Sequence, residues 1–271
     1  MKDPILISII SICMIFLATT LGSALVFFFK KTYSFKIKSI ILGFAGGIMV
    51  SVAFFGLILP SIQQSQAIRI YSNWQFIPPL VGFLFGGLLL YALDKLIPHF
   101  HEFTDTEEGL PNRAVSQNIR FFLAVAIHNI PEGLSVGFAC GLAIALRADP
   151  VLAAAASASA LSLAIGISVQ NIPEGAAVSI PMFGDGMKKG KAFLFGAFSG
   201  IVEPIFAIIA IFLAQLTIIT PWLLAFGAGA MLYVTLDEIM PKARQNGYSH
   251  YSMWSFMIGF ALMMILEVSL G

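Results

Sequence analysis

Residues 128–133 read His-Asn-Ile-Pro-Glu-Gly, and residues 170–175 read Gln-Asn-Ile-Pro-Glu-Gly. Each run lies inside a long apolar stretch, and the two stretches follow one another along the chain. Because consecutive membrane-spanning helices run in opposite directions, the two runs predict an antiparallel pair of related half-sites. This layout is typical of an inverted repeat, whose two-fold axis lies in the plane of the membrane.

The composition indicates that lipid surrounds most of this protein. Hydrophobic residues make up 58% of the 271 residues and charged residues only 11%, whereas a typical soluble domain carries about 25% charged residues. A net charge of +1 gives no electrostatic argument for a nucleic-acid partner. The two cysteines lie in apolar runs and indicate neither a disulfide framework nor a thiolate metal site.

Eight apolar stretches predict an all-α polytopic membrane protein, because a spanning helix needs about 20 apolar residues. They form one transmembrane domain over residues 1–271, with helices at roughly 4–29, 39–62, 76–98, 119–146, 151–181, 192–216, 219–241 and 252–270. The first stretch exceeds the ~7–15 residues of a signal-peptide core and is interpreted as a retained helix. A weaker similarity between 43–60 and 226–241 extends the repeat, so that helices one to three mirror helices six to eight.

Lysine and arginine residues predict the orientation in the membrane. Most of the 15 basic residues lie in or beside the first, third, fifth and seventh loops: Lys30, Lys31, Lys36, Lys38, Lys95, Arg113, Arg120, Lys188, Lys189, Lys191, Lys242 and Arg244. These loops are therefore predicted to be cytoplasmic and both termini extracytoplasmic, in a plasma or inner membrane. A chain with eight spans must have both termini on the same side of the membrane, and the orientation predicted from the basic residues meets this requirement.

Two glutamates lie deep inside predicted spans. An ionised side chain there costs at least about 2.5–3.5 kcal/mol, and a bound cation would offset that cost for Glu132 and Glu174. Residues four apart share a helix face, so His128 lies on the face of Glu132 and Gln170 on the face of Glu174. The alternative to a cation site is a polar packing interface closed by hydrogen bonds. Two buried glutamates, one in each copy of the motif, argue against that alternative.

Three further residues extend the predicted site. Asn129 and Asn171 flank the two glutamate faces, and Glu203 lies near the middle of the predicted sixth helix. Pro204 follows Glu203 and has no N–H, so the carbonyl of Gly200 is expected to lack its helical partner. Freed carbonyls at membrane depth are tolerated where they line a polar cavity or bind an ion.

The predicted ligands are carboxylate, imidazole and amide groups without a thiolate. Such ligands suit Zn²⁺, Fe²⁺, Mn²⁺, Co²⁺ or Cd²⁺ better than Cu⁺. Three buried carboxylates favour two adjacent divalent ions bridged by Glu132 and Glu174. The predicted function is transport of these ions, which are substrate and not cofactor, by a protein that is not an enzyme.

Other functions remain as alternatives. The direction of transport stays open, so a metal exporter or a metal/proton exchanger is the main one. An intramembrane metalloprotease is disfavoured because the chain lacks His-Glu-x-x-His. A water or solute channel is disfavoured because buried glutamates in both repeats attract cations.

More acidic and imidazole residues lie near the cytoplasmic ends of the third and seventh predicted helices. One interpretation is an exit path that delivers metal to the cytoplasm, and the other is interfacial charge or ordinary loop residues. The residues concerned are Asp94, His99, His101, Asp237 and Glu238.

The two motifs resemble those of the ZIP (Zrt-, Irt-like protein) family of divalent-metal transporters, in particular its prokaryotic GufA-like branch. The resemblance covers the whole chain, including Glu-Pro in the sixth helix and Asp-Glu before a proline in the seventh. It implies an eight-helix bundle in a 3+2+3 arrangement with an inverted repeat. It further implies metal uptake by alternating access, in which the helices outside the fourth, fifth and sixth move against these three, with zinc the favoured metal.

The resemblance also implies a binuclear site. Its first metal would be held by His128, Glu132, Gln170 and Glu174, and its second by Asn129, Glu132, Asn171, Glu174 and Glu203. Some relatives have aspartate at the position of Asn171, and many eukaryotic members have histidine at that of Gln170. The partners expected are the lipid bilayer and the metal ions, and a homodimer is compatible with a sequence that specifies none.

Overall fold

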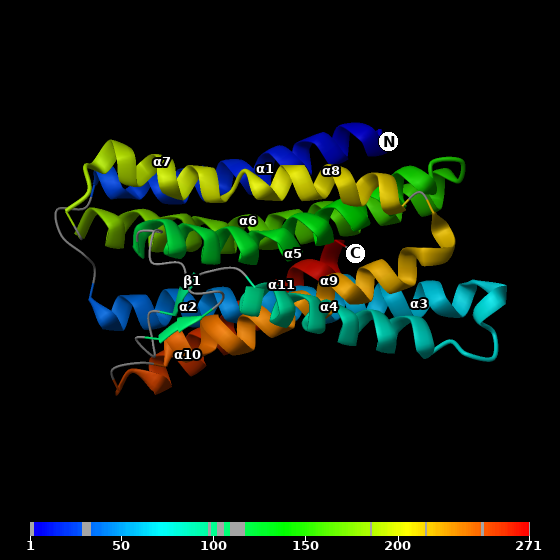
Figure 1. The fold of residues 1–271 in the computed structure, drawn as a ribbon. Helices are drawn as coiled ribbons and strands as arrows, with labels where there is room; N and C mark the ends of the chain where they lie inside the picture. Colours follow the sequence, from blue (N-terminus) through cyan, green and yellow to red (C-terminus); the bar gives the residue numbers. More distant parts are fainter. Residues whose placement is uncertain are drawn as a thin grey trace.

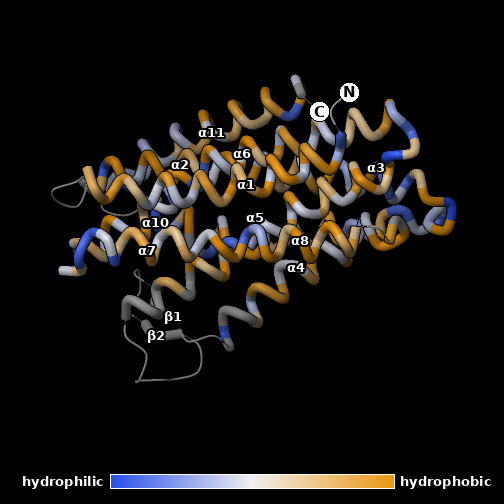
Figure 2. The backbone as a smooth tube through the Cα atoms, turned by 90° about the horizontal axis from the view of Figure 1, so that it is seen from above, coloured by the Kyte–Doolittle hydropathy of each residue, from blue (hydrophilic) through white to orange (hydrophobic). Residues whose placement is uncertain are grey.

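The computed structural model describes residues 3–28, 34–96, 99–101, 106–108, 117–184, 186–214, 216–244 and 247–270. Within these ranges helices lie over all eight apolar stretches, and six helical segments are long and apolar enough to cross a membrane. Figure 2 shows hydrophobic residues along most of the helix lengths and hydrophilic ones mainly at their ends. The chain is therefore a helical, multi-pass membrane protein.

The first five spans contain both repeated motifs. Their elements are α1 (Pro4–Ala24) with a 3₁₀ turn (Leu25–Phe27), α2 (Phe35–Ser51), a π-helical segment (Val52–Ile58), α3 (Leu59–Ala67), α4 (Ile77–Leu96), α5 (Gln117–Ala145) and α6 (Pro150–Gly184). Side-chain oxygens of Asp3 and Ser34 accept hydrogen bonds from backbone N–H groups and cap α1 and α2. α5 and α6 both continue through the proline of their motif.

Two of the last three spans, the sixth and the seventh, are more interrupted than the hydropathy pattern predicts. They consist of α7 (Lys189–Ser199), α8 (Val202–Ala214), α9 (Thr220–Val234), a π-helical segment (Thr235–Ile239), α10 (Met240–Ala243) and α11 (Ser249–Leu270). The predicted sixth helix is thus two helices that meet at 200–201. Pro204 lies in the first turn of α8, where proline is tolerated because that N–H has no helical partner.

A small β-hairpin departs from the all-α prediction. In the described part of the third loop, β1 (His99–His101) pairs antiparallel with β2 (Thr106–Glu108), and His99 lies opposite Glu108. Hydropathy gave no signal for it, because such short strands lie outside the apolar stretches.

The helices pack in two groups. In one, α1 packs mainly along α6 and α5 along α8, and α5 and α6 contact each other; in the other, α2 packs along α11 and α4 along α9. Figure 1 shows α1, α5, α6, α7 and α8 on one side of α2, α3, α4, α9 and α10. A continuous apolar core, which includes Met49, Leu163 and Met231, joins them.

A Phe-x-x-Gly pattern sets the close helix contacts of the second group. It occurs once in each of its four long helices, as Phe44–Gly47, Phe83–Gly86, Phe226–Gly229 and Phe256–Gly259. A Cβ atom on any of these glycines would overlap the carbonyl oxygen of the phenylalanine on the partner helix. The contact is reciprocal between α2 and α11 and again between α4 and α9, so glycine lets both backbone pairs approach closely.

Candidate metal centre

The two motif glutamates meet through one glutamine where α5 packs against α6. The Gln170 amide nitrogen donates a hydrogen bond to Oε1 of Glu132 and lies 3.3 Å from Oε2 of Glu174. Glu132 is completely buried and Gln170 is buried as well, whereas Glu174 is partly accessible. Glu132 of α5 therefore lies against Gln170 of α6, which also lies beside Glu174.

The carboxylate of Glu203 lies beside this pair and accepts hydrogen bonds at both oxygens. Asn171 Nδ2 donates to Oε2 over 2.9 Å, and the Thr19 hydroxyl of α1 donates to Oε1 over 2.8 Å. All three side chains are completely buried. Thr19 is a contact that the motif analysis did not identify, because it lies in α1, far along the chain from either motif.

The break between α7 and α8 is part of the site. Asn129 Nδ2 donates to the carbonyl oxygen of Ser199, the last residue of α7, over 3.0 Å. The prediction that the Gly200 carbonyl lacks a partner is wrong, because the backbone N–H of Glu203 donates to it over 3.2 Å in a tighter turn. Glu203 lies in the first turn of α8, where the positive end of the helix dipole favours a carboxylate.

Three buried acceptors in the site have no hydrogen-bond donor among the described residues. They are Oδ1 of Asn129, Oε2 of Glu132 and Oε1 of Gln170. Buried polar atoms are normally paired, and a cation pairs with oxygen acceptors without needing a donor. The chemistry of these unpaired atoms therefore fits a hard or borderline divalent metal ion.

The glycine after each motif glutamate brings a neighbouring helix close. A Cβ atom on Gly133 would overlap the backbone oxygen of Glu203, and one on Gly175 would overlap the backbone oxygen of Thr19. α8 thus lies against the motif of α5, and α1 lies against the motif of α6.

Comparison with known proteins shows which family this chain belongs to. The pattern of a family described as "ZIP Zinc transporter" matches residues 104–267, which is more than half of the chain. This range includes every residue of the candidate metal centre named above except Thr19. The chain belongs to the ZIP zinc transporter family. The transporters of this family are not enzymes, as the sequence predicted.

Curated ZIP relatives match along most of their length. Zinc transporter ZIP11 of Xenopus tropicalis is 33% identical, over 99% of this chain and 98% of the relative. Zinc transporter ZupT of Chlorobium chlorochromatii is 31% identical over 98% of both chains. Zinc transporter GufA of Myxococcus xanthus is 32% identical over 70% of both.

Of the side chains predicted for the ZIP exit path, the structure describes that of Asp237. Asp94 lies in α4 and His99 and His101 in β1, but the described side chains do not include theirs, nor those of His128 and Glu238. Asp237 is exposed in the second π-helical segment. Among the described residues, no group of three or more His, Cys, Asp or Glu side chains lies close enough together to hold a metal ion. The candidate centre combines carboxylates with the amides of Asn129, Gln170 and Asn171.

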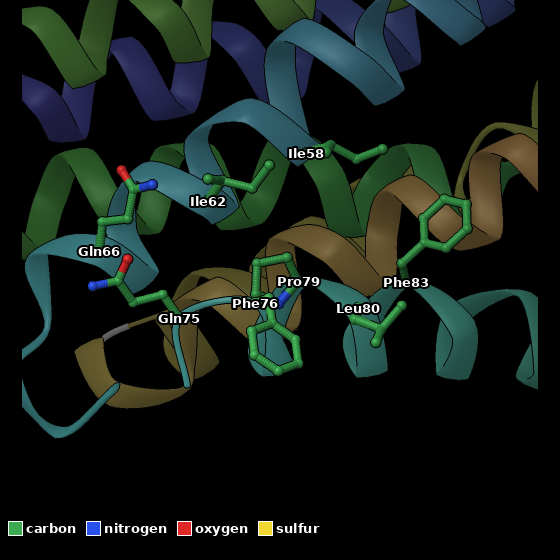
Figure 3. A pocket seen from close by; sticks show the side chains of 8 residues that line it. All are labelled: Ile58, Ile62, Gln66, Gln75, Phe76, Pro79, Leu80 and Phe83. Carbon is green, nitrogen blue, oxygen red and sulfur yellow. The ribbon is translucent and has the colours of Figure 1, made fainter. Parts of the chain in front are cut away.

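A separate cavity of about 520 Å³, where α3 approaches the start of α4, shares no lining residue with the candidate centre. Figure 3 shows its lining, which is apolar except for Gln66 and Gln75. It contains no carboxylate or imidazole group, so it is a poor site for a divalent metal ion.

Proposed function

We propose that this ZIP protein carries divalent transition-metal ions, zinc first among them, across the membrane into the cytoplasm. The observation that carries the proposal is the cluster of buried oxygen acceptors around Glu132, Gln170 and Glu203. Three acceptors in this cluster have no hydrogen-bond donor within the part of the chain that the structure describes. The zinc-transporter names of the relatives support zinc as the main substrate. Cadmium, iron, manganese and cobalt ions suit the same ligands.

We further propose two adjacent metal positions. His128, Glu132, Gln170 and Glu174 would hold one ion, and Asn129, Glu132, Asn171, Glu174 and Glu203 the other. The Gln170 amide nitrogen faces two carboxylates, so its side chain would rotate to offer Oε1 to the first metal. The Asn171 amide would likewise turn from Glu203 when the second metal binds.

The arrangement of the helix ends supports the proposed orientation. In Figure 1 the start of α2, the junction of α6 with α7, the end of α10 and β1 all lie at one end of the bundle. Lys188, Lys189, Lys191, Lys242 and Arg244 belong to this end. The excess of basic residues supports this end as the cytoplasmic one, and both termini would then be extracytoplasmic.

The repeated contacts support the 3+2+3 inverted repeat. The second and seventh spans each contain a π-helical segment, and the reciprocal Phe-x-x-Gly contacts relate α2 and α11 to α9 and α4. The contact of Gly175 with Thr19 corresponds in the same way to that of Gly133 with Glu203.

The packing also suggests which helices move together during alternating access. α1 packs with the ion-holding helices, so we assign it to their group and not to the remaining helices. An apolar cavity of about 450 Å³ separates the groups near Phe138, Phe206 and Trp222. Rigid movement of one group against the other would expose the central site to each side in turn.

A vesicle assay tests the proposed function against the exporter and exchanger alternatives. Purified protein is placed in vesicles of known protein orientation, and radioactive zinc flux is measured under imposed gradients of zinc, pH and voltage. We expect saturable zinc movement from the extracytoplasmic face to the cytoplasmic face, driven by the zinc gradient. Flux that requires an opposing proton gradient would establish the exchanger, outward flux alone the exporter, and no flux would overturn transport.

Replacing Asn171 with aspartate should tighten metal binding. The change removes the amide donor that contacts Glu203 and the Ile15 carbonyl, and it adds a negative charge beside the second metal. We expect zinc affinity to rise about 10-fold, because even a partner outside the ligand shell changes metal affinity by this much, together with lower thermal stability without metal. Calorimetric titration checks this, and unchanged affinity would show that Asn171 is not a ligand.

A further inference from the structure

The hydroxyl of Thr19 has a partner that a threonine in an apolar helix does not ordinarily have. Such hydroxyls commonly bond the carbonyl one turn back in their own helix, as Thr20 does with Phe16 over 2.9 Å. The Thr19 hydroxyl lies 2.8 Å from Oε1 of Glu203, closer than the 3.3 Å to its own Ile15 carbonyl. It therefore reaches out of α1 to a buried carboxylate of the candidate metal centre.

The surroundings of Thr19 hold it in this place. A Cβ atom on Gly200 would lie 2.8 Å from Cβ of Thr19, and the backbone of Thr19 fills the space beside Gly175. Thr19 has no solvent-accessible surface. Its position is thus determined by the break between α7 and α8 on one side and by the α6 motif on the other.

Thr19 occupies the position in its half of the protein that Glu203 occupies in the other. Gly133 follows the α5 glutamate and packs on the backbone of Glu203, and Gly175 follows the α6 glutamate and packs on the backbone of Thr19. The two equivalent positions then meet through their side chains. One half supplies a carboxylate and the other supplies the donor that orients it.

We propose that Thr19 is a positioning residue of the metal centre, which holds Oε1 of Glu203 so that Oε2 stays available to the ion. The inference rests on the proposed function, because it assigns a partner to one of the proposed ligands. In the structure Asn171 occupies Oε2, so binding of metal would exchange one amide contact and leave the Thr19 contact intact. α1 thereby becomes part of the site although it supplies no ligand.

The test compares hydroxyl removal at two adjacent positions. Thr19→Val and the control Thr20→Val each replace a hydroxyl with a methyl group of similar size, but only Thr19 contacts Glu203. We expect Thr19→Val to weaken zinc binding about 10-fold, as loss of an outer partner does, and Thr20→Val to leave it unchanged. Thr19→Ser, which keeps the hydroxyl, should restore most of the affinity.

A double-mutant cycle separates positioning from packing. Zinc affinity is measured by calorimetry on folded protein, with thermal melting as the check on folding. In the Glu203→Ala background, Thr19→Val should have no further effect on the remaining zinc site. The inference is overturned if Thr19→Val lowers zinc affinity equally in the wild-type and the Glu203→Ala backgrounds. It is also overturned if Thr19→Val binds zinc with wild-type affinity. Failure of wild-type protein to bind zinc would instead refute the proposed function.

Discussion

Zinc transport should fall to the level of empty vesicles when Glu132 is replaced by glutamine. Glutamine keeps the size of the side chain but removes the charge, and Glu132 is proposed to contribute to both metal positions. Its Oε2 atom is buried and has no donor among the described residues. Without that carboxylate the site loses its central anion, so nothing comparable offsets the cost of stripping water from a divalent ion.

The measurement is zinc and cadmium flux into vesicles, with equal amounts of folded protein confirmed by size-exclusion profile and melting temperature. Glu267→Gln is the matched control, because Glu267 is also a buried carboxylate but lies in α11, beside Gly56 and away from the site. We expect it to transport normally. Near-normal flux in both Glu132→Gln and Glu174→Gln would falsify the proposed site.

Replacing Gly133 with alanine should both impair transport and destabilise the protein. The new Cβ atom would overlap backbone atoms of Glu203, which cannot move aside as a flexible side chain can. Overpacking of this kind costs about 1–3 kcal/mol. Because α8 would shift away from α5, the Glu203 carboxylate would also leave its place between Thr19 and Asn171.

Gly190→Ala is the control for this change. Gly190 lies in α7, and a Cβ atom there would have no neighbour within 4 Å, so the change should be neutral or slightly stabilising. We expect the melting temperature of Gly133→Ala to fall by several degrees and its zinc flux at least about 10-fold, since positional shifts near a site have large effects. Equal melting temperature and flux for the two variants would contradict the close contact between α5 and α8.

The two halves of the site are related but chemically unequal. One half places Glu203 and the other Thr19 at equivalent positions, and the motifs differ as His128 against Gln170. These differences change the charge and the donor atoms that the two halves offer to the proposed metal positions. The inequality is therefore where we expect the choice between zinc, cadmium, iron and manganese to be made.

The sequence alone determined the membrane character, the eight apolar stretches and the residues of the candidate site. These features are local or periodic, since a span needs a continuous apolar run and ligands four residues apart share a helix face. The duplicated motif also indicated that α5 and α6 are antiparallel partners, because buried glutamates in lipid need compensation.

Only the tertiary structure decided how the remaining helices complete the site. The break before Glu203, the packing of α1 with α5, α6 and α8 and the Thr19 contact each depend on segments far apart in the sequence. Apolar helices have similar compositions, so hydropathy does not reveal which pairs approach closely. Glycine contacts decide this, because a backbone can reach a neighbouring backbone only where no side chain lies between them.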